Sequence, residues 1–351
     1  MSRFSICSLR WAVAGAIMAA TTSVQAAAAQ GCMPLKFLSP GFAGLQSRFL
    51  DAHEWQLSIS GRRVATSKFF VGSSEDEAAA PGGQPLYLHL NSIDLAATYA
   101  LTNRVTVTGS IPFSYSTASN FNPDGARHQV ASGGIGDVNL MFDGWVLDPG
   151  AHVNGNIVIG LGAKAPTGSN HSTDNFWLPG QVIQQPVPQT IQEGDGGWAL
   201  LAELQGFQHL AGLTSVYASG QYSASLRQHT DVVWAPANEE WAVPDVYSAR
   251  AGFSLAVDPH HGLSLSAGGR IDGTAIQDIF HKHGDYYRHA GYTVYLEPGL
   301  SWLNGRDQFT VTVPIRLRQQ YFSMYSTTQG WEAGTGGANN YLIYASYSRR
   351  F

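Results

Sequence analysis

Charge is scarce in this chain, and cysteine is nearly absent. Asp, Glu, Lys and Arg make up only 13% of the 351 residues, which is about half of their usual share in soluble domains. The formal net charge is −5 and no basic block occurs, so the chain lacks the clustered positive charge that nucleic acids require. Only Cys7 and Cys32 are present. Cys7 lies in a leader-like N-terminus, which leaves one thiol and excludes an internal disulfide framework; the role of Cys32 stays open.

Long hydrophobic runs are also missing. Arg3 and Arg10 precede a short apolar run over residues 11–20, and small residues follow it up to Ala29. This pattern predicts a signal peptide over residues 1–29, and therefore export. No later segment reaches the roughly 18 consecutive apolar residues that a transmembrane helix needs. An exported chain of this kind can still cross a membrane as a closed β-barrel, because closure satisfies every backbone hydrogen bond within the sheet.

Alternation of apolar and polar residues takes the place of helical periodicity. In the segment 308–321, for example, Val311 and Val313 alternate with Thr310 and Thr312. Alternating segments of about ten residues that are bounded by turns are typical of outer-membrane barrels. The sequence therefore predicts an all-β fold, an antiparallel transmembrane barrel of about 12 strands. The expected strands cover 54–63, 93–101, 104–115, 137–147, 152–165, 198–210, 214–226, 246–257, 263–273, 292–303, 308–321 and 340–351.

The connections between these segments alternate strictly between tight and long. Five are tight, at 102–103, 148–150, 211–212, 258–262 and 304–307, and they carry the Asn, Asp, Gly and Pro residues that tolerate turn dihedrals. Bacterial barrels have short periplasmic turns and long extracellular loops. We therefore expect a barrel over 53–351 in the outer membrane of a Gram-negative-type cell, with outer-membrane lipid around it. Residues 30–52 are expected to form an N-terminal segment, either a periplasmic tether or a lumen plug.

The C-terminal strand carries a further signal. Tyr341, Ile343 and Tyr347 share one face of the alternating segment that ends at Phe351. A terminal aromatic residue on such a strand resembles the signal that the barrel assembly machinery reads, so this machinery is an expected partner. Arg349 departs from the pattern, because it occupies a position where that signal usually has an apolar residue.

Two glycine-rich motifs stand at neighbouring strand ends. Residues 133–138 read Gly-Gly-Ile-Gly-Asp-Val, and residues 160–168 read Gly-Leu-Gly-Ala-Lys-Ala-Pro-Thr-Gly. Together they resemble the outer-membrane barrel family associated with phenol meta-cleavage pathways, which is distantly similar to the long-chain fatty-acid transporter group. The resemblance implies uptake of hydrophobic or aromatic compounds. From the residues alone, turn chemistry at strand ends explains both motifs equally well.

Charged residues on the polar strand faces define the candidate site. Many lie about seven residues from the tight-turn end, which corresponds to a rise of roughly 16 Å in a tilted strand. This predicts a mixed belt of charges near mid-membrane, with an arginine-rich arc that favours anionic or polar-headed solutes. The alternative is a lattice of ion pairs that fills and stiffens the barrel. The candidate pore-lining residues are Asp94, Lys164, Glu203, Arg250, Arg270, Asp272, Glu297, Arg316 and Arg318.

The expected function is a channel or transporter for small-molecule solutes. The alternatives are a structural or adhesive barrel with a filled lumen and, less favoured, a barrel enzyme that acts on lipid. An enzyme is not expected, because no serine and histidine are placed to form a nucleophile–base pair. No cofactor or metal is expected either, since His281, His283 and His289 match no standard ligand spacing. The apolar long loop over 167–197 is expected either to fold into the barrel mouth or to pack on neighbouring loops.

Overall fold

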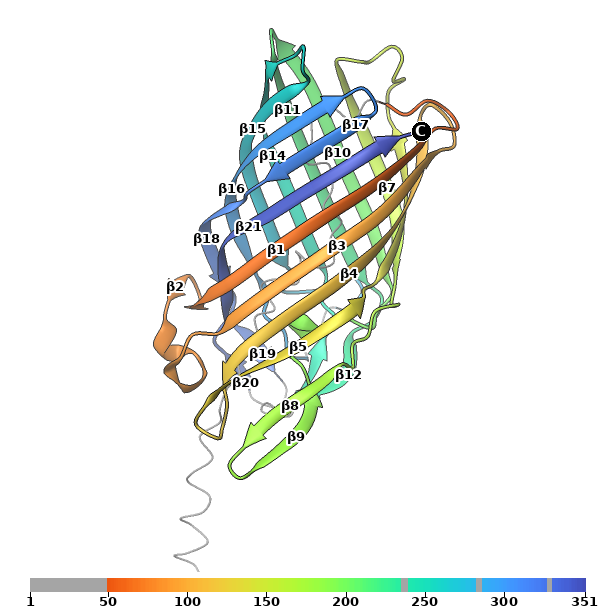
Figure 1. The fold of residues 1–351 in the computed structure, drawn as a ribbon. Coiled ribbons are helices and arrows are strands. Elements are labelled where there is room, and N and C mark those ends of the chain that lie inside the picture. Colours follow the sequence, from red (N-terminus) through yellow and green to blue (C-terminus); the bar gives the residue numbers. More distant parts are fainter. Residues whose placement is uncertain (1–48, 235–238, 282–285, 327–329) are drawn as a thin grey trace, which may run out of the picture.

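The computed structural model describes residues 49–234, 239–281, 286–326 and 330–351, which form a closed antiparallel barrel (Figure 1). The expected signal peptide, Cys32, and the segment 30–52 up to residue 48 lie outside the described residues. Twelve strands form the wall, as predicted, and the eleventh is divided into β17 and β18. The wall consists of β1 (Trp55–Val71), β3 (Tyr87–Ala100), β4 (Val105–Phe121), β6 (Val138–Trp145), β7 (Gly155–Ala165), β10 (Ala199–Ala211), β11 (Thr214–Ser225), β14 (Val246–Asp258), β15 (Leu263–Thr274), β16 (Gly291–Asn304), β17 (Asp307–Thr312), β18 (Ile315–Tyr321) and β21 (Thr335–Arg350).

Each wall strand pairs with its neighbours in the sequence, and β1 closes the ring. Its residues pair with β3 on one side and with β21 on the other, so that Gln56 lies between Thr98 and Arg350. The eleventh strand is interrupted at Val313 and Pro314, because proline has no N–H to donate to a sheet. Leu342 N–H donates to the Pro314 carbonyl at 2.9 Å, which keeps the wall joined at the break.

The remaining elements lie at the long-loop end (Figure 1). β5 (Arg127–Ile135) extends the wall by pairing with β4. Three separate hairpins stand in the loops: β8 (Thr173–Leu178) with β9 (Gln181–Pro186), β12 (His229–Trp234) with β13 (Glu239–Ala242), and β19 (Met324–Ser326) with β20 (Gly330–Glu332). The short elements are β2 (Ser74–Glu75) and the 3-10 helices η2 (Glu77–Ala79), η3 (Pro81–Gly83) and η4 (Gln189–Ile191). None of the helices in these described ranges is both long and apolar enough to cross a membrane.

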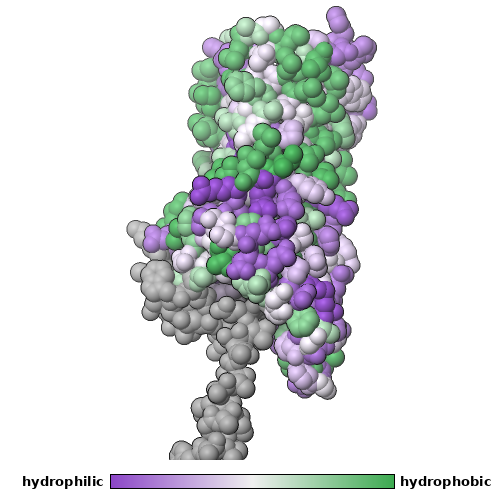
Figure 2. Space-filling model, turned by 90° about the vertical axis from the view of Figure 1, so that its left-hand side faces the viewer, coloured by the Kyte–Doolittle hydropathy of each residue, from purple (hydrophilic) through white to green (hydrophobic). Residues whose placement is uncertain are grey.

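The apolar faces of the strands point outward. Leu161, Leu204 and Phe253 are 65%, 57% and 61% exposed, whereas the alternate positions carry buried polar groups such as Arg270 and Glu297. Figure 2 shows apolar side chains around the barrel wall and hydrophilic ones towards the long-loop end. Strand periodicity allows either face to point inward, and the structure shows the arrangement that suits lipid.

Because the outer face contacts lipid, a charged residue placed on it should destabilise the barrel, and most strongly near the middle of the membrane. Leu204→Arg, near the middle of β10, is expected to lower the free energy of unfolding by roughly 2–4 kcal/mol, the cost of an arginine at the bilayer midplane. Leu226 is also exposed, at 45%, but follows β11 at the loop end, so Leu226→Arg serves as the matched control with a small effect. Urea unfolding in lipid vesicles measures both variants. Equal effects of the two substitutions would contradict the outward, membrane-facing assignment.

Candidate functional site in the barrel lumen

A buried charge network occupies the inner face of β14, β15 and β16. Arg250 and Arg270 lie directly opposite each other on β14 and β15. Glu297 of β16 bridges them, because its two oxygens lie 3.2 Å from Arg250 Nη1 and 3.2 Å from Arg270 Nη1. Asp272 Oδ2 lies 2.9 Å from Arg270 Nε. The two guanidinium groups are therefore tolerated side by side because carboxylates neutralise them.

Tyr344 of β21, which follows β16 and the eleventh strand in the wall, joins this network. Its hydroxyl accepts a 3.0 Å hydrogen bond from Arg270 Nη2, and the Arg270 guanidinium also lies 4.8 Å from the centre of the Tyr344 ring. On the next strand, Arg62 donates to Asp94 at 3.1 Å. We call the inner-face charges Arg62, Asp94, Arg250, Arg270, Asp272 and Glu297 the lumen belt.

An acidic arc faces inward on the strands β6, β7 and β10. Asp143 and Glu203 pair in register with the same residue, Gly160, from either side. A Cβ at this position would collide with Asp143 Oδ1, so the glycine makes room for both carboxylates. Glu203 accepts a hydrogen bond from Gln221. The lumen thus carries an acidic pair on one arc, whereas the three arginines of the lumen belt are matched there by three carboxylates.

An apolar cluster lies directly next to the lumen belt, on its long-loop side. Val187 and Ile191, from the loop 167–197, pack against buried inner-face residues of the wall. The loop therefore folds into the barrel mouth, which was one of the two expected arrangements. Tyr344 belongs to this cluster and to the belt, so the apolar and charged zones are contiguous. The full cluster comprises Val64, Leu86, Leu88, Leu90, Ala118, Val187, Ile191, Tyr295, Leu342 and Tyr344.

The two glycine-rich motifs hold that loop in place through a buried ion-pair triad. Lys164, only 2% exposed, pairs with Asp137 at 3.3 Å and with Asp195. Asp137 Oδ1 accepts from the Gly168 N–H at 3.0 Å, and its Oδ2 accepts from the Asp195 N–H at 3.2 Å. Thr167 Oγ1 donates to the Gly136 carbonyl at 2.7 Å. We call Asp137, Lys164 and Asp195 the loop latch, because they fasten both ends of the loop to the wall.

Close backbone contact explains one glycine of the second motif. A Cβ on Gly168 would lie 2.8 Å from the Gly194 nitrogen. Any larger residue at position 168 would therefore push apart the two ends of the loop, which contact each other here. Glu193 adds a further attachment, because it accepts hydrogen bonds from the Ser132 and Ser172 hydroxyls at 2.6 and 2.7 Å. The motifs are therefore more than strand-end turns, since they build the loop latch.

The structure places seven of the nine predicted pore-lining residues in three groups. Asp94, Arg250, Arg270, Asp272 and Glu297 lie together in the lumen belt, and Glu203 lies in the acidic arc. Lys164 belongs instead to the loop latch.

The remaining two predicted residues, Arg316 and Arg318, lie on β18. Arg316 is half-buried, donates to Asn340 at 2.8 Å and stacks 4.6 Å from the Phe70 ring centre. Arg318 departs from the prediction: it is exposed and pairs in register with the outward-facing Val294. The cause is an irregularity in the β16–β18 register, which shifts the alternation by one residue.

Sequence reasoning missed several residues of the lumen. Arg62 continues the polar face of its strand after Ser58 and Ser60, so simple alternation identifies it. Tyr344 shares a strand face with Ser346 and Ser348, and no charge or motif in its neighbourhood marks it as part of a site. Asp195 lies in a long loop, and no local pattern links it to Lys164.

The outer loops contain a buried histidine. His289 is 4% exposed and packs between the rings of Tyr287, Trp241 and Tyr321, at 5.0, 6.3 and 6.3 Å between centroids. Burial lowers the pKa of His289 to about 4, against a weaker opposing effect from a backbone hydrogen bond at Thr335. His281 is half-buried, and His283 lies outside the described residues.

The lowered pKa makes the loop region sensitive to acid. The unfolded chain protonates this histidine below a pKa of about 6.5, whereas the folded chain keeps it neutral. The stability that is present above about pH 6.5 is therefore lost as pH falls towards the pKa of the folded state. We expect the free energy of unfolding to drop by at most about 3 kcal/mol between pH 7 and pH 4 for this reason. His289→Gln should flatten that slope, whereas substitution of the exposed His261 should not. Urea titrations at several pH values measure this, and identical slopes for parent and His289→Gln would refute it.

The described part of the N-terminal segment enters the periplasmic end of the lumen. The Phe49 ring contacts Trp145 of β6 edge-on at 4.6 Å and lies 6.2 Å from Phe207 of β10, measured between centroids. Trp145 and Phe207 face inward, because they pair in register with the buried residues Val158 and Asn156. Phe49 therefore packs against the inner face of the wall.

Comparisons with known proteins agree with this fold. No protein-family model matches the sequence, and no curated protein matches it. Among solved structures, an outer membrane channel from Pseudomonas putida has a TM-score of 0.61 and is 16% identical, covering 90% of this chain and 100% of that chain. A FadL homologue from Pseudomonas aeruginosa is 8% identical with a TM-score of 0.42, covering 87% and 91%. The toluene transporter TbuX from Ralstonia pickettii is 11% identical with a TM-score of 0.40, covering 86% and 90%. The first likeness supports the barrel fold, and the exposed apolar side chains of the outer wall indicate independently that this barrel spans a membrane.

Proposed function

We propose that the barrel is an outer-membrane channel for small solutes that combine an apolar, often aromatic, body with an anionic or polar head. One observation carries the proposal: Tyr344 packs in the apolar cluster while its hydroxyl binds Arg270 of the lumen belt. A solute that passes this point meets apolar side chains and guanidinium groups at the same time. Arginine is well suited to bind carboxylates in such a site because its planar group donates two parallel hydrogen bonds.

The loop 167–197 acts as the gate in this proposal. Val187 and Ile191 fill the mouth above the lumen belt, and the loop latch fixes them there. The belt residues are only 2–8% exposed, which corresponds to a closed resting state. Passage then requires movement of the loop and exchange of the internal ion pairs for solute contacts.

The described end of the N-terminal segment, residues 49–52, is the second closure, on the periplasmic side. Support comes from Phe49, whose ring packs against the inward-facing Trp145 and Phe207. The resemblance to the family associated with phenol meta-cleavage pathways supports aromatic acids as the first solutes to examine.

Liposome swelling tests the channel function. Liposomes that contain the purified barrel are expected to swell faster in benzoate than in an uncharged sugar of similar size, since benzoate has an apolar ring and a carboxylate. Protein-free liposomes control for passage of benzoic acid through the lipid. The buried ion pairs of the belt specifically favour one rival, a structural barrel with a filled lumen. Absence of protein-dependent swelling in every solute would support that rival and reject the channel.

A further inference from the structure

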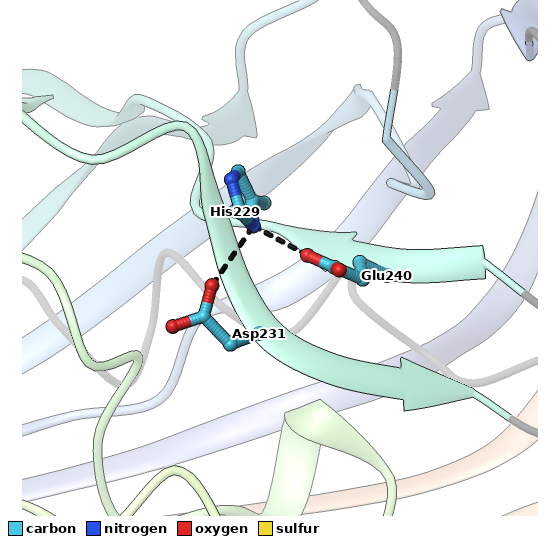
Figure 3. Close-up of side chains that lie close together, drawn as sticks. All are labelled: His229, Asp231 and Glu240. Carbon is cyan, nitrogen blue, oxygen red and sulfur yellow. Dashed lines mark ion pairs between the residues drawn. The ribbon is translucent and has the colours of Figure 1, made fainter.

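We propose that the outer hairpin β12–β13 holds a divalent metal ion of the first transition row, with Zn²⁺ as the principal candidate. The ligands are His229, Asp231 and Glu240, whose donor atoms all lie within 4.8 Å of one another. Figure 3 shows the three side chains converging from the two strands of the hairpin. The site is separate from the lumen belt and does not depend on the proposed channel function.

The donor set and spacing suit such an ion. His229 Nδ1 lies 3.2 Å from Asp231 Oδ1 and also lies against Glu240 Oε2. In a tetrahedral zinc site with bonds of about 2.1 Å, neighbouring ligand atoms lie about 3.4 Å apart. One imidazole nitrogen and two carboxylate oxygens leave a fourth position for water, the arrangement of an open zinc site. The Glu240 side chain need only move back slightly to admit the ion.

Two of the three donor atoms lack a hydrogen-bond partner. His229 Nδ1 and Glu240 Oε2 are each buried from solvent at the atomic level, and neither makes a hydrogen bond. Buried polar atoms that make no hydrogen bond are uncommon in folded proteins, and here the two atoms face each other in an ion-pair contact. Two facing atoms of this kind, both able to supply a lone pair, are what a bound cation satisfies.

The surroundings orient the ligands. Arg227 Nη2 binds Asp231 Oδ2, which leaves Oδ1 directed at His229. The His229 ring stacks on Tyr286, at 4.4 Å between centroids and an interplanar angle of 17°. Such outer contacts are typical of metal sites because they fix the direction of each ligand.

Asp231 also adopts an unusual backbone conformation. Its φ is +60°, in the left-handed region, and it lies where the β12–β13 register is irregular. A non-glycine residue in this region is commonly found where a side chain is held for function. The conformation here places the carboxylate beside His229.

A bound ion would fasten two outer loops together. Glu240 is tied through its backbone to the next loop, because its carbonyl accepts from the Tyr287 N–H at 3.0 Å. Tyr286, the neighbour of Tyr287, stacks on the ring of the ligand His229. The ion would therefore cross-link the hairpin and stabilise its contact with the segment that follows β15.

Zn²⁺ titration calorimetry of the folded barrel in detergent micelles tests the site. We expect one Zn²⁺ per chain, with affinity lowered at least about ten-fold by His229→Ala and by Glu240→Gln, since each removes one of three ligands. His261→Ala is the matched control, because His261 also pairs with a carboxylate, Asp258, at 2.7 Å, but lies in a tight turn at the other end of the barrel. It should bind Zn²⁺ as the parent does.

A second measurement guards against loss of folding. Heat-dependent mobility in detergent gels reports whether each variant forms the barrel, and Co²⁺ absorption reports the coordination geometry, since tetrahedral Co²⁺ absorbs strongly in the visible. A folded parent that takes up no Zn²⁺ would show that His229 forms only ion pairs with the carboxylates and would overturn the proposal. Binding that survives both substitutions would overturn it as well.

Discussion

Lys164→Ala is expected to release the loop 167–197 and to raise single-channel conductance several-fold. The substitution leaves Asp137 and Asp195 facing each other, both buried, without the cation that joins them. Removal of one partner from a buried ion pair typically costs roughly 3–5 kcal/mol, because the remaining charge is desolvated and uncompensated. The loop can relieve this cost by leaving the mouth, which also withdraws Val187 and Ile191 from the apolar cluster. Conductance in planar bilayers is the direct measurement.

Lys68→Ala provides the control for the Lys164 prediction. Lys68 also pairs with acidic side chains at the long-loop end, but it and its partner Glu75 are 32% and 40% exposed at the side chain. Exposed pairs of this kind contribute only about 0–1 kcal/mol, so conductance should not change. A Lys164→Ala barrel that folds, as judged by gel mobility, and conducts like the parent would show that the loop latch does not hold the gate.

Arg270→Ala is expected to shift the ion selectivity of the channel towards cations. Arg270 contacts Asp272, Glu297 and Tyr344, so its removal takes away one positive charge and leaves Asp272 and Glu297, of which Glu297 still pairs with Arg250. The excess negative charge that remains is poorly screened inside a narrow lumen, so it strongly affects passing ions. The reversal potential across a salt gradient should move in the cation-selective direction, and Glu297→Gln should move it the opposite way.

Arg318→Ala separates a lumen effect from a general loss of positive charge. Arg318 lies on the exposed side of β18, so this variant removes the same charge without altering the lumen belt. Its reversal potential should match that of the parent. If Arg270→Ala and Arg318→Ala give the same potential, the lumen belt does not determine selectivity.

The strand pattern by itself determined most of the wall. Alternating residues in segments such as 246–257 and 263–273 predicted β14 and β15 within one residue at each end. Strict alternation also fixes which side chains share a face, and this is why Arg250, Arg270 and Glu297 could be grouped before any coordinates. The prediction failed at Arg318, where Pro314 and the irregular β16–β18 register shift the alternation. Such an irregularity depends on how two distant strands pair, and the sequence of one strand does not encode it.

Tertiary structure alone decided the direction of the faces and the assembly of the long-range contacts. Alternation is the same whether the apolar face points inward or outward, and the exposure of side chains such as Leu161 and Phe253 on the folded wall shows the direction. The loop latch joins Lys164 to Asp195 across 31 residues, and Tyr344 reaches Arg270 across 74. Contacts between residues so far apart in the chain follow from the closure of the barrel and the path of its loops. The local sequence therefore determined the strands and their two faces, while the fold determined which side chains meet inside.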